Sequence, residues 1–207
     1  MMDDVGMGDD GTVGDLSELS QVLIAAFEVL QSGAQDRRAA FHTPVFASLG
    51  LDGRPLSRII VLREFDPDQR NLRFHTDWRS HKVGQIRHDP RVSFTFYDPA
   101  MKLQLRCEGQ ARLHHQDAIS AKAWEASQRM SKVCYGTAPA PGLVIEQADD
   151  FAMPDDQESI AAGQEHFCAV ITQVTTLEWL WLGFKGHRRA RFIWDDNGNV
   201  DGVWLVP

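Results

Sequence analysis

The sequence predicts a mainly β protein with flanking helices, folded as an antiparallel barrel. Short apolar runs alternate with turn signals such as Asp52-Gly53, which is typical of a β-hairpin. Most of these runs follow one another directly, whereas a parallel Rossmann sheet needs a helix between successive strands. No G-x-x-x-x-G-K-[ST] motif occurs, and the one G-x-G-x-x-G, at residues 6–11, comes before every expected strand instead of following one. A length of 207 residues suits one domain with a substantial core.

The first element is an acidic tail. Residues 1–14 are rich in Gly, Asp and Met and have no apolar period, so we expect them to be disordered. Residues 15–207 would then form the single domain. The first fifteen residues hold five of the aspartates that make the net charge −8. A second block, residues 146–158, holds six acids and no Lys or Arg.

Three helices are expected. The first is amphipathic, begins at an Asp15 or Ser17 cap and ends near Gly33. The second covers Ser80–His88 and stops at Asp89-Pro90. The third covers Asp117–Lys132. Apolar residues at helical spacing define the first helix, namely Leu16, Leu19, Leu23, Ala26, Phe27 and Leu30. Candidate inner positions of the third are Ile119, Ala123 and Met130.

Short strands account for most of the remaining apolar runs. They are separated by Asp-, Asn-, Gly- and Pro-containing turns, which favours hairpin connections. The expected strands are Val45–Leu49, Leu56–Arg63, Leu72–Thr76, Arg91–Tyr97, Leu103–Leu113, Phe167–Thr175, Leu177–Leu182, Arg191–Trp194 and Val200–Val206.

Charge is distributed unevenly over these elements. Residues 54–91 carry nine cations and five acids, although the chain as a whole is acidic. An acidic protein is repelled from a nucleic-acid backbone. The local cationic segment instead suits a small anionic ligand. The run from Arg58 to Arg63 has a cation at each end of an apolar strand. An anionic ligand at the strand edge would pair with one of them, and the alternative is two arginines reaching solvent at strand ends.

A second polar segment lies where a strand runs into the second helix. The N–H groups at a helix N-terminus point at anions, and the Ser80 hydroxyl can cap the helix or bind a phosphate. Lys82 adds positive charge and His81 a hydrogen-bond donor. Together with Arg58 these residues suggest a phosphate cradle. An ordinary capped surface helix is the alternative.

The late strands supply further candidates. Gln104 shares a strand face with Arg106, and its amide suits the polar edge of a heteroaromatic ring. Trp181 and Arg191 flank a turn near Gly183–Gly186, where an indole and a guanidinium could hold a flat anionic ligand. A solvent-facing polar row, a core tryptophan and a solvated basic loop are the alternatives. The basic residues of this region are Lys185, His187, Arg188, Arg189 and Arg191.

Other chemistries find little support in the sequence. The three cysteines, Cys107, Cys134 and Cys168, are widely spaced and read as small buried hydrophobes. Adjacent histidines at 114 and 115 would point to opposite faces of a strand, so we expect no metal site. No apolar run approaches the ~20 residues of a membrane span. No signal peptide is visible, which predicts a cytoplasmic protein.

Taken together, the motifs resemble the pyridoxamine 5′-phosphate oxidase family of FMN-binding split barrels. The resemblance runs from about Thr43 to Gly109 and resumes at Leu177–Pro207. It implies an antiparallel split β-barrel (FMN-binding split barrel). The ordered set is Arg58-x-x-x-Leu62-Arg63, His75-Thr76, Ser80-His81-Lys82, Asp89-Pro90-Arg91-Val92, Gln104, Trp181 and Arg191.

The same resemblance implies a homodimer with FMN at the subunit interface. Arg58, His81 and Lys82 would hold the FMN phosphate, with Ser80 beside them. His75 and Thr76 would help to place the cofactor. The residues that would line the isoalloxazine ring are Ile59, Ile60, Val61, Leu62 and Arg63. Those that would approach it from the other subunit are Gln104, Trp181 and Arg191.

The expected function is that of an FMN-dependent oxidoreductase acting on a small substrate, with an anionic one favoured. The chain departs from the family's substrate-phosphate clamp, because His187-Arg188-Arg189 and Cys134-Tyr135-Gly136 stand at its positions. We therefore expect poor oxidation of vitamin B6 phosphates. The alternatives are a flavin-sequestering protein without turnover, a true pyridoxamine 5′-phosphate oxidase, and a reductase using a deazaflavin or binding haem. Candidate substrate residues are Arg63, Arg129, Lys132, His187 and Arg189.

Overall fold

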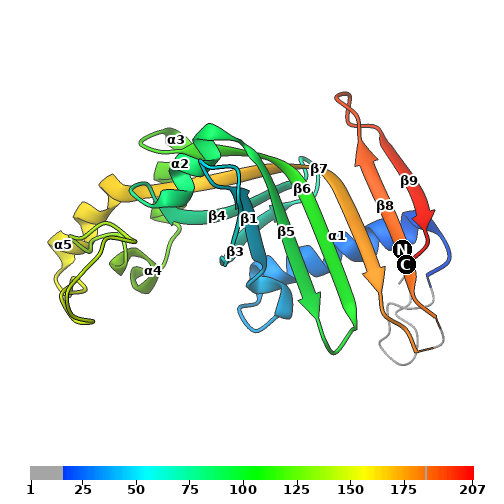
Figure 1. Cartoon of the computed structure of the whole chain (residues 1–207), viewed down its shortest axis with the longest axis horizontal. Helices are drawn as coiled ribbons and strands as arrows, with labels where there is room; N and C mark the ends of the chain where they lie inside the picture. The colour runs from blue at the N-terminus through cyan, green and yellow to red at the C-terminus, as the bar shows by residue number, and fades with distance from the viewer. Residues whose placement is uncertain (1–15, 185) are drawn as a thin grey trace, which may run out of the picture.

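The computed structural model describes residues 16–184 and 186–207, so the expected disordered tail lies outside the described residues. Nine strands form one antiparallel sheet in the order β2-β1-β5-β6-β7-β4-β3, with β8 added to β7 and β9 to β8 (Figure 1). The sheet does not close on itself. The strands are β1 Val45–Leu49, β2 Pro55–Ile59, β3 Leu62–Asp66, β4 Asn71–Asp77, β5 Arg91–Asp98, β6 Leu103–His114, β7 Phe167–Trp181, β8 Arg188–Trp194 and β9 Val200–Leu205.

Helices cover one side and one end of this sheet. In Figure 1, α1 crosses the sheet, while α4 and α5 lie at the end opposite the β8–β9 hairpin. No described helix is long and apolar enough to cross a membrane. The helical elements are α1 Leu19–Gln35, η2 Ala40–His42, α2 His81–His88, α3 Ala118–Glu125, α4 Arg129–Val133, α5 Gln157–Ala162 and η3 Gly163–His166.

The strand β7 joins the β2-β1-β5-β6 part of the sheet to β4-β3 and to the β8–β9 hairpin. Over its 15 residues it pairs with β6, and its other edge pairs first with β4 and then with β8. We expected two strands here. The chain stays continuous because an irregularity opposite Gly109 absorbs the change of register. A Cβ on Gly109 would lie 2.0 Å from the carbonyl oxygen of Gln173, so only glycine permits this approach.

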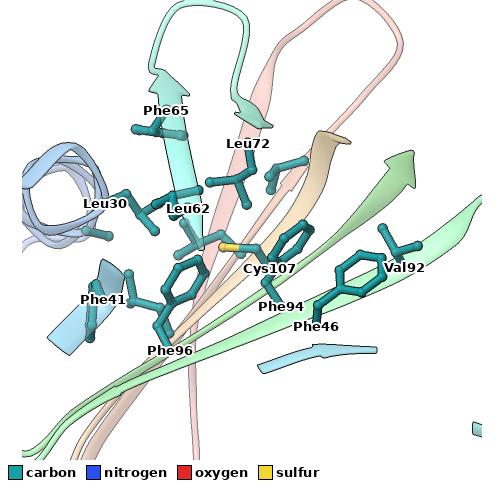
Figure 2. Close-up of a cluster of buried hydrophobic side chains, with 14 of the residues drawn as sticks. Leu30, Phe41, Phe46, Leu62, Phe65, Leu72, Val92, Phe94, Phe96 and Cys107 are labelled. Atoms are coloured by element: carbon teal, nitrogen blue, oxygen red, sulfur yellow. The ribbon is translucent and has the colours of Figure 1, made fainter. Parts of the chain in front are cut away.

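The core lies between α1 and the concave side of the sheet. Val22, Ala26 and Leu30 are buried on one face of α1, as the spacing predicts. The helix starts after Glu18 without a side-chain cap and continues past Gly33 to Gln35, which corrects both expected ends. Gly33 instead lets Phe41 pack against the helix. Figure 2 shows Leu30 facing the strands and the aromatic rings that fill the centre.

The expected strand Leu56–Arg63 is divided in two. β2 ends at Ile59 and β3 begins at Leu62, and these strands occupy opposite ends of the sheet order. Ile60 leaves the sheet edge by donating its N–H to the Pro44 carbonyl. The crossing buries Ile60 and Leu62, so the same apolar run serves a connection as well as two strands.

Two further expectations need correction. The helix expected over Asp117–Lys132 is broken between α3 and α4, and Ile119 and Met130 are exposed while Ala123 is buried. Asp117 does cap α3, where its carboxylate accepts from the Ser120 N–H at 2.8 Å. Cys107 and Cys168 are buried as expected, but Cys134 is exposed.

Candidate functional site

The guanidinium of Arg58 is held on the core side of the sheet by two neutral side chains. Its Nη1 donates to Ser48 Oγ at 2.7 Å, and its Nη2 donates to Gln85 Oε1 at 2.9 Å. The group also lies over the ring of Phe46, 5.6 Å from the ring centroid. Burial lowers the pKa of Arg58. Within the described residues Arg58 forms no ion pair with a carboxylate, so its charge is not neutralised.

Lys82 is held in the same way. Its Nζ donates to Thr76 Oγ1 at 3.0 Å, and Thr76 Oγ1 lies 3.2 Å from Ser80 Oγ. Burial lowers the pKa of Lys82, and the charge of Arg58 lowers it further. Two nearby cations without a carboxylate partner in the described part of the chain are an unfavourable arrangement by themselves. An anion between them would relieve it.

The turn from β4 into α2 places these groups. Ser80 is the residue before the first turn of α2, but its hydroxyl faces Thr76 instead of capping the helix. His81 is exposed, and its ring lies beside Gly142. An ion pair between Arg79 and Asp77, with nitrogen and oxygen 2.7 Å apart, fixes the corner. We name the set Arg58, Thr76, Ser80, His81 and Lys82 the cradle.

The sequence predicts Arg58, Ser80, His81 and Lys82 as one anion site but does not predict the two residues that orient Arg58. Ser48 faces the helix from β1, and Gln85 lies one turn into α2. Both side chains are buried. Nothing in their spacing sets them apart, because a Ser in a strand and a Gln in a polar helix are both common on surfaces.

His75 and Thr76 point to opposite faces of β4, so the structure separates this predicted pair. His75 lines a cavity of about 520 Å³ that is also lined by Arg63, Arg73 and Ser131. Burial, with the charges of Arg73 and Arg63, lowers the pKa of His75 to about 3. The imidazole is therefore neutral, and the cavity wall carries its positive charge on arginines.

Of the predicted substrate residues, Arg63 alone lines this cavity, where its Nη2 lies 3.4 Å from Ser131 Oγ. Arg129 donates to the Asp155 carbonyl at 2.9 Å, and Lys132 lies over the ring of Trp124. His187 is exposed and Arg189 pairs with Glu178, both near the turn between β7 and β8. One chain therefore does not bring these five residues together.

The late-strand candidates divide between the two faces of the sheet. Gln104 pairs with Leu180, and Arg191 pairs with Glu178, so both project from the outer face. Trp181 pairs with the fully buried Leu103 and packs against the core, on the opposite face. The structure therefore brings Gln104 and Arg191 to one face and leaves Trp181 away from them.

On that outer face a carboxylate joins two arginines. Glu178 accepts from Arg106 at 3.0 Å and from Arg189 at 2.6 Å. Arg58 projects from the core face of β2, while its neighbour Ile59 lies in the same cross-sheet row as Arg106 and Arg191. Within one chain, then, Gln104 and Arg191 lie on the sheet face opposite the cradle.

Comparison with known proteins decides the family. The pattern described as "Pyridoxamine 5'-phosphate oxidase, FMN-binding domain" matches residues 25–115. "Pyridoxine/pyridoxamine 5'-phosphate oxidase 2" of Arabidopsis thaliana is 30% identical over 167 residues, which cover 76% of this chain and 81% of the relative. The pyridoxine/pyridoxamine 5'-phosphate oxidase of Pseudomonas paraeruginosa is 38% identical over 167 residues, covering 76% and 73%. The chain belongs to the pyridoxamine 5'-phosphate oxidase family.

Solved structures of this family share the fold. A pyridoxamine 5'-phosphate oxidase-related, FMN binding protein from Nostoc punctiforme superimposes with a TM-score of 0.72 at 21% identity, covering 88% of this chain and 96% of that one. PhzG from Burkholderia lata, solved with tetrahydrophenazine-1-carboxylic acid, gives a TM-score of 0.68 at 20% identity, covering 99% and 98%. The expected split-barrel class is confirmed.

FMN is the cofactor of the family's domain, and the cradle has the chemistry that the phosphate of FMN requires. A guanidinium has five N–H donors and an ammonium three. Ser48 and Gln85 use two donors of Arg58, which leaves three, and Thr76 uses one of Lys82, which leaves two. The hydroxyls of Thr76 and Ser80 add two more hydrogen-bonding groups.

Proposed function

We propose that this protein is an FMN-dependent oxidoreductase that acts on a small anionic substrate. The observation that carries the proposal is the cradle, in which the half-buried Arg58 and Lys82 lie near each other and are held by neutral oxygens. A phosphate dianion fits such a site because charge-assisted hydrogen bonds are about twice as strong as neutral ones.

Binding of the phosphate in the cradle would position the rest of the cofactor. Arg58, His81 and Lys82 would bind the phosphate, and residues 59–63 would follow the isoalloxazine ring. Arg63, the last residue of this segment, would then lie at the end of the ligand away from the phosphate. When bound, the flavin supplies a two-electron acceptor. The chain supplies position, exclusion of water and a positive field.

The cavity beside Arg63 is the proposed substrate site. Arg63 provides positive charge at its wall, whereas Arg73 is paired with Glu64 and neutral His75 provides none. Ser127 and Gln128 of the α3–α4 connection and Ser131 of α4 contribute neutral hydrogen-bonding groups. With Arg129 and Lys132 engaged elsewhere, the wall keeps less charge than five converging cations would give. This supports a small anionic substrate and poor turnover of pyridoxine and pyridoxamine 5'-phosphates.

A homodimer would complete the site. Gln104 and Arg191 lie on the sheet face opposite the cradle, so a ligand can meet both groups only between two copies. That outer face also exposes large apolar side chains. They are Val45, Ile59, Tyr97, Ile193 and Val203. Several large apolar side chains exposed on one face are typical of an interface. The cytoplasmic location remains a prediction from the sequence.

A true vitamin B6 phosphate oxidase is the second candidate, since the two relatives compared above bear that name. A flavin-sequestering protein without turnover is the third. Steady-state assays with pyridoxine and pyridoxamine 5'-phosphates separate the first two. We expect kcat/KM well below ~10⁴ M⁻¹s⁻¹, the lower end of ordinary enzymes, and a value at or above it would establish the second candidate. A yellow protein that no reductant bleaches under anaerobic conditions would support sequestration.

A further inference from the structure

We propose that Ser48 and Gln85 are positioning residues that aim the Arg58 guanidinium at the cofactor phosphate without neutralising it. They would thereby determine how strongly the protein prefers FMN to riboflavin, which lacks the phosphate. This inference rests on the proposed function, because it assumes that the cradle binds FMN.

The three side chains form a closed triangle of hydrogen bonds. Arg58 donates to Ser48 Oγ at 2.7 Å and to Gln85 Oε1 at 2.9 Å, and Ser48 Oγ donates to the same Gln85 oxygen at 2.8 Å. The two partners are 5% and 8% exposed, respectively, so water does not readily replace them. The triangle joins β1, β2 and α2, which makes the guanidinium part of the packed structure.

The neutrality of the two acceptors distinguishes Arg58 from the arginines that are ion-paired. Arg79 pairs with Asp77, and Arg189 with Glu178, so a carboxylate accompanies each of those charges. A carboxylate at position 85 could accept the same hydrogen bonds as the amide. It would also bring a negative charge to Arg58 and oppose a phosphate. Gln85 therefore combines two properties that Glu lacks together: it orients the arginine and leaves its charge available.

The experiment measures the affinities of FMN and riboflavin separately. Flavin-free full-length protein is titrated with each flavin, and the quenching of flavin fluorescence is followed. For Gln85→Glu we expect FMN to bind at least about tenfold more weakly, with the riboflavin affinity unchanged within about twofold. Gln69→Glu is the matched control, because it makes the same chemical change at an exposed position of the β3–β4 turn and should alter neither affinity.

A second pair of variants tests the triangle without adding charge. Ser48→Ala removes a hydroxyl that both accepts from Arg58 and donates to Gln85, so we expect FMN binding to weaken about three- to tenfold with riboflavin unaffected. Ser48→Thr keeps the hydroxyl and should restore the preference. These variants also decide the question if Gln85→Glu does not fold.

The outcomes distinguish a failure of the positioning role from a failure of the proposed function. Equal losses for FMN and riboflavin would show that Ser48 and Gln85 are merely structural and would overturn the inference. Unchanged FMN affinity in both Gln85→Glu and Ser48→Ala would overturn it as well. If the unsubstituted chain bound neither flavin, the proposed function itself would fail, and the positioning role with it.

Discussion

The cations on the core side of the sheet have different partners from those on the outer side. On the core side, Arg58 and Lys82 are held by serine, glutamine and threonine oxygens. On the outer side, Arg106 and Arg189 share the carboxylate of Glu178. Both regions look equally basic in the sequence. In the described structure the core-side cations have no carboxylate partner, whereas Glu178 balances much of the positive charge on the outer side.

Because the partners of the cations differ in charge between the two sides, the number of cations in a segment does not by itself locate an anion site. A cation is available to a ligand when its hydrogen bonds are satisfied by neutral groups, because orientation is then obtained without neutralisation. Four predictions test this contrast, and they are taken in order of decreasing expected effect.

Removal of a cradle cation should have the largest effect. Arg58→Ala and Lys82→Ala should each weaken FMN binding by on the order of 1.5–3 kcal/mol, since each removes charge-assisted hydrogen bonds. Fluorescence titration measures the loss. Arg129→Ala, which removes a cation that bonds to the Asp155 carbonyl, is the control. FMN affinity that survives both cradle substitutions would remove the distinction between the two regions.

Acidification should expose the cost of burying His75 beside arginines. The pKa of His75 is about 3 in the folded chain, against an ordinary value near 6.5, so the unfolded chain takes up the proton first. Stability from this residue is complete above pH 6.5 and is lost as pH falls towards 3. From pH 7 to 5 the loss should be about 2 kcal/mol of the free energy of unfolding. Urea unfolding of the parent protein and of His75→Asn at both pH values isolates the contribution of His75. If the free energy of unfolding changed equally with pH in the two proteins, the prediction would be contradicted.

Loss of the carboxylate of Glu178 should leave the positive charge of the outer face unbalanced. Glu178→Gln leaves Arg106 and Arg189 without their common counter-charge, and we expect the free energy of unfolding to fall by about 1–2 kcal/mol. High salt should recover part of the loss, since it screens the repulsion between the two arginines. Chemical denaturation at low and high ionic strength measures both effects. A variant as stable as the parent protein would show that the charges are not balanced internally.

An exposed pair should have the smallest effect. Arg91 and Asp89 form a short ion pair whose arginine side chain is 74% exposed. Exposed pairs contribute little, because water screens them and the side chains lose freedom. Arg91→Ala should therefore leave both FMN affinity and thermal unfolding unchanged within measurement error. A clear drop in FMN affinity would place Arg91 in the binding site and enlarge the cradle.

Local signals in the sequence predicted much of the fold. The Asp52-Gly53 turn is present, with Gly53 at a φ of +80°, and Asp89-Pro90 ends α2 as expected. The division of Leu56–Arg63 was not predictable, because an apolar run looks the same in a strand and in a buried crossing. The face on which Trp181 lies was not predictable either, because it depends on the pairing register of two distant strands. Leu180, not Trp181, pairs with Gln104, and the local sequence does not reveal this.

The candidate site, too, was predictable only in part from the sequence. Arg58, Ser80 and Lys82 were predicted as one anion site because charge and a helix start coincide in the sequence. Ser48 and Gln85 were not, since they lie 10 and 27 residues from Arg58 and meet it only through packing. The separation of His75 from Thr76 follows from strand alternation alone and was available from the sequence.

The shared strand β7 also constrains how the chain can be synthesised and folded. Until residues 167–181 emerge from the ribosome, β6 and β4 each present a bare edge, because β7 is the missing neighbour of both. Bare edges of this kind template aggregation. A nascent chain of about four-fifths of the full length therefore has most of its strands but no completed sheet, and a translation pause just before Phe167 is the point at which this protein is most exposed to misassembly.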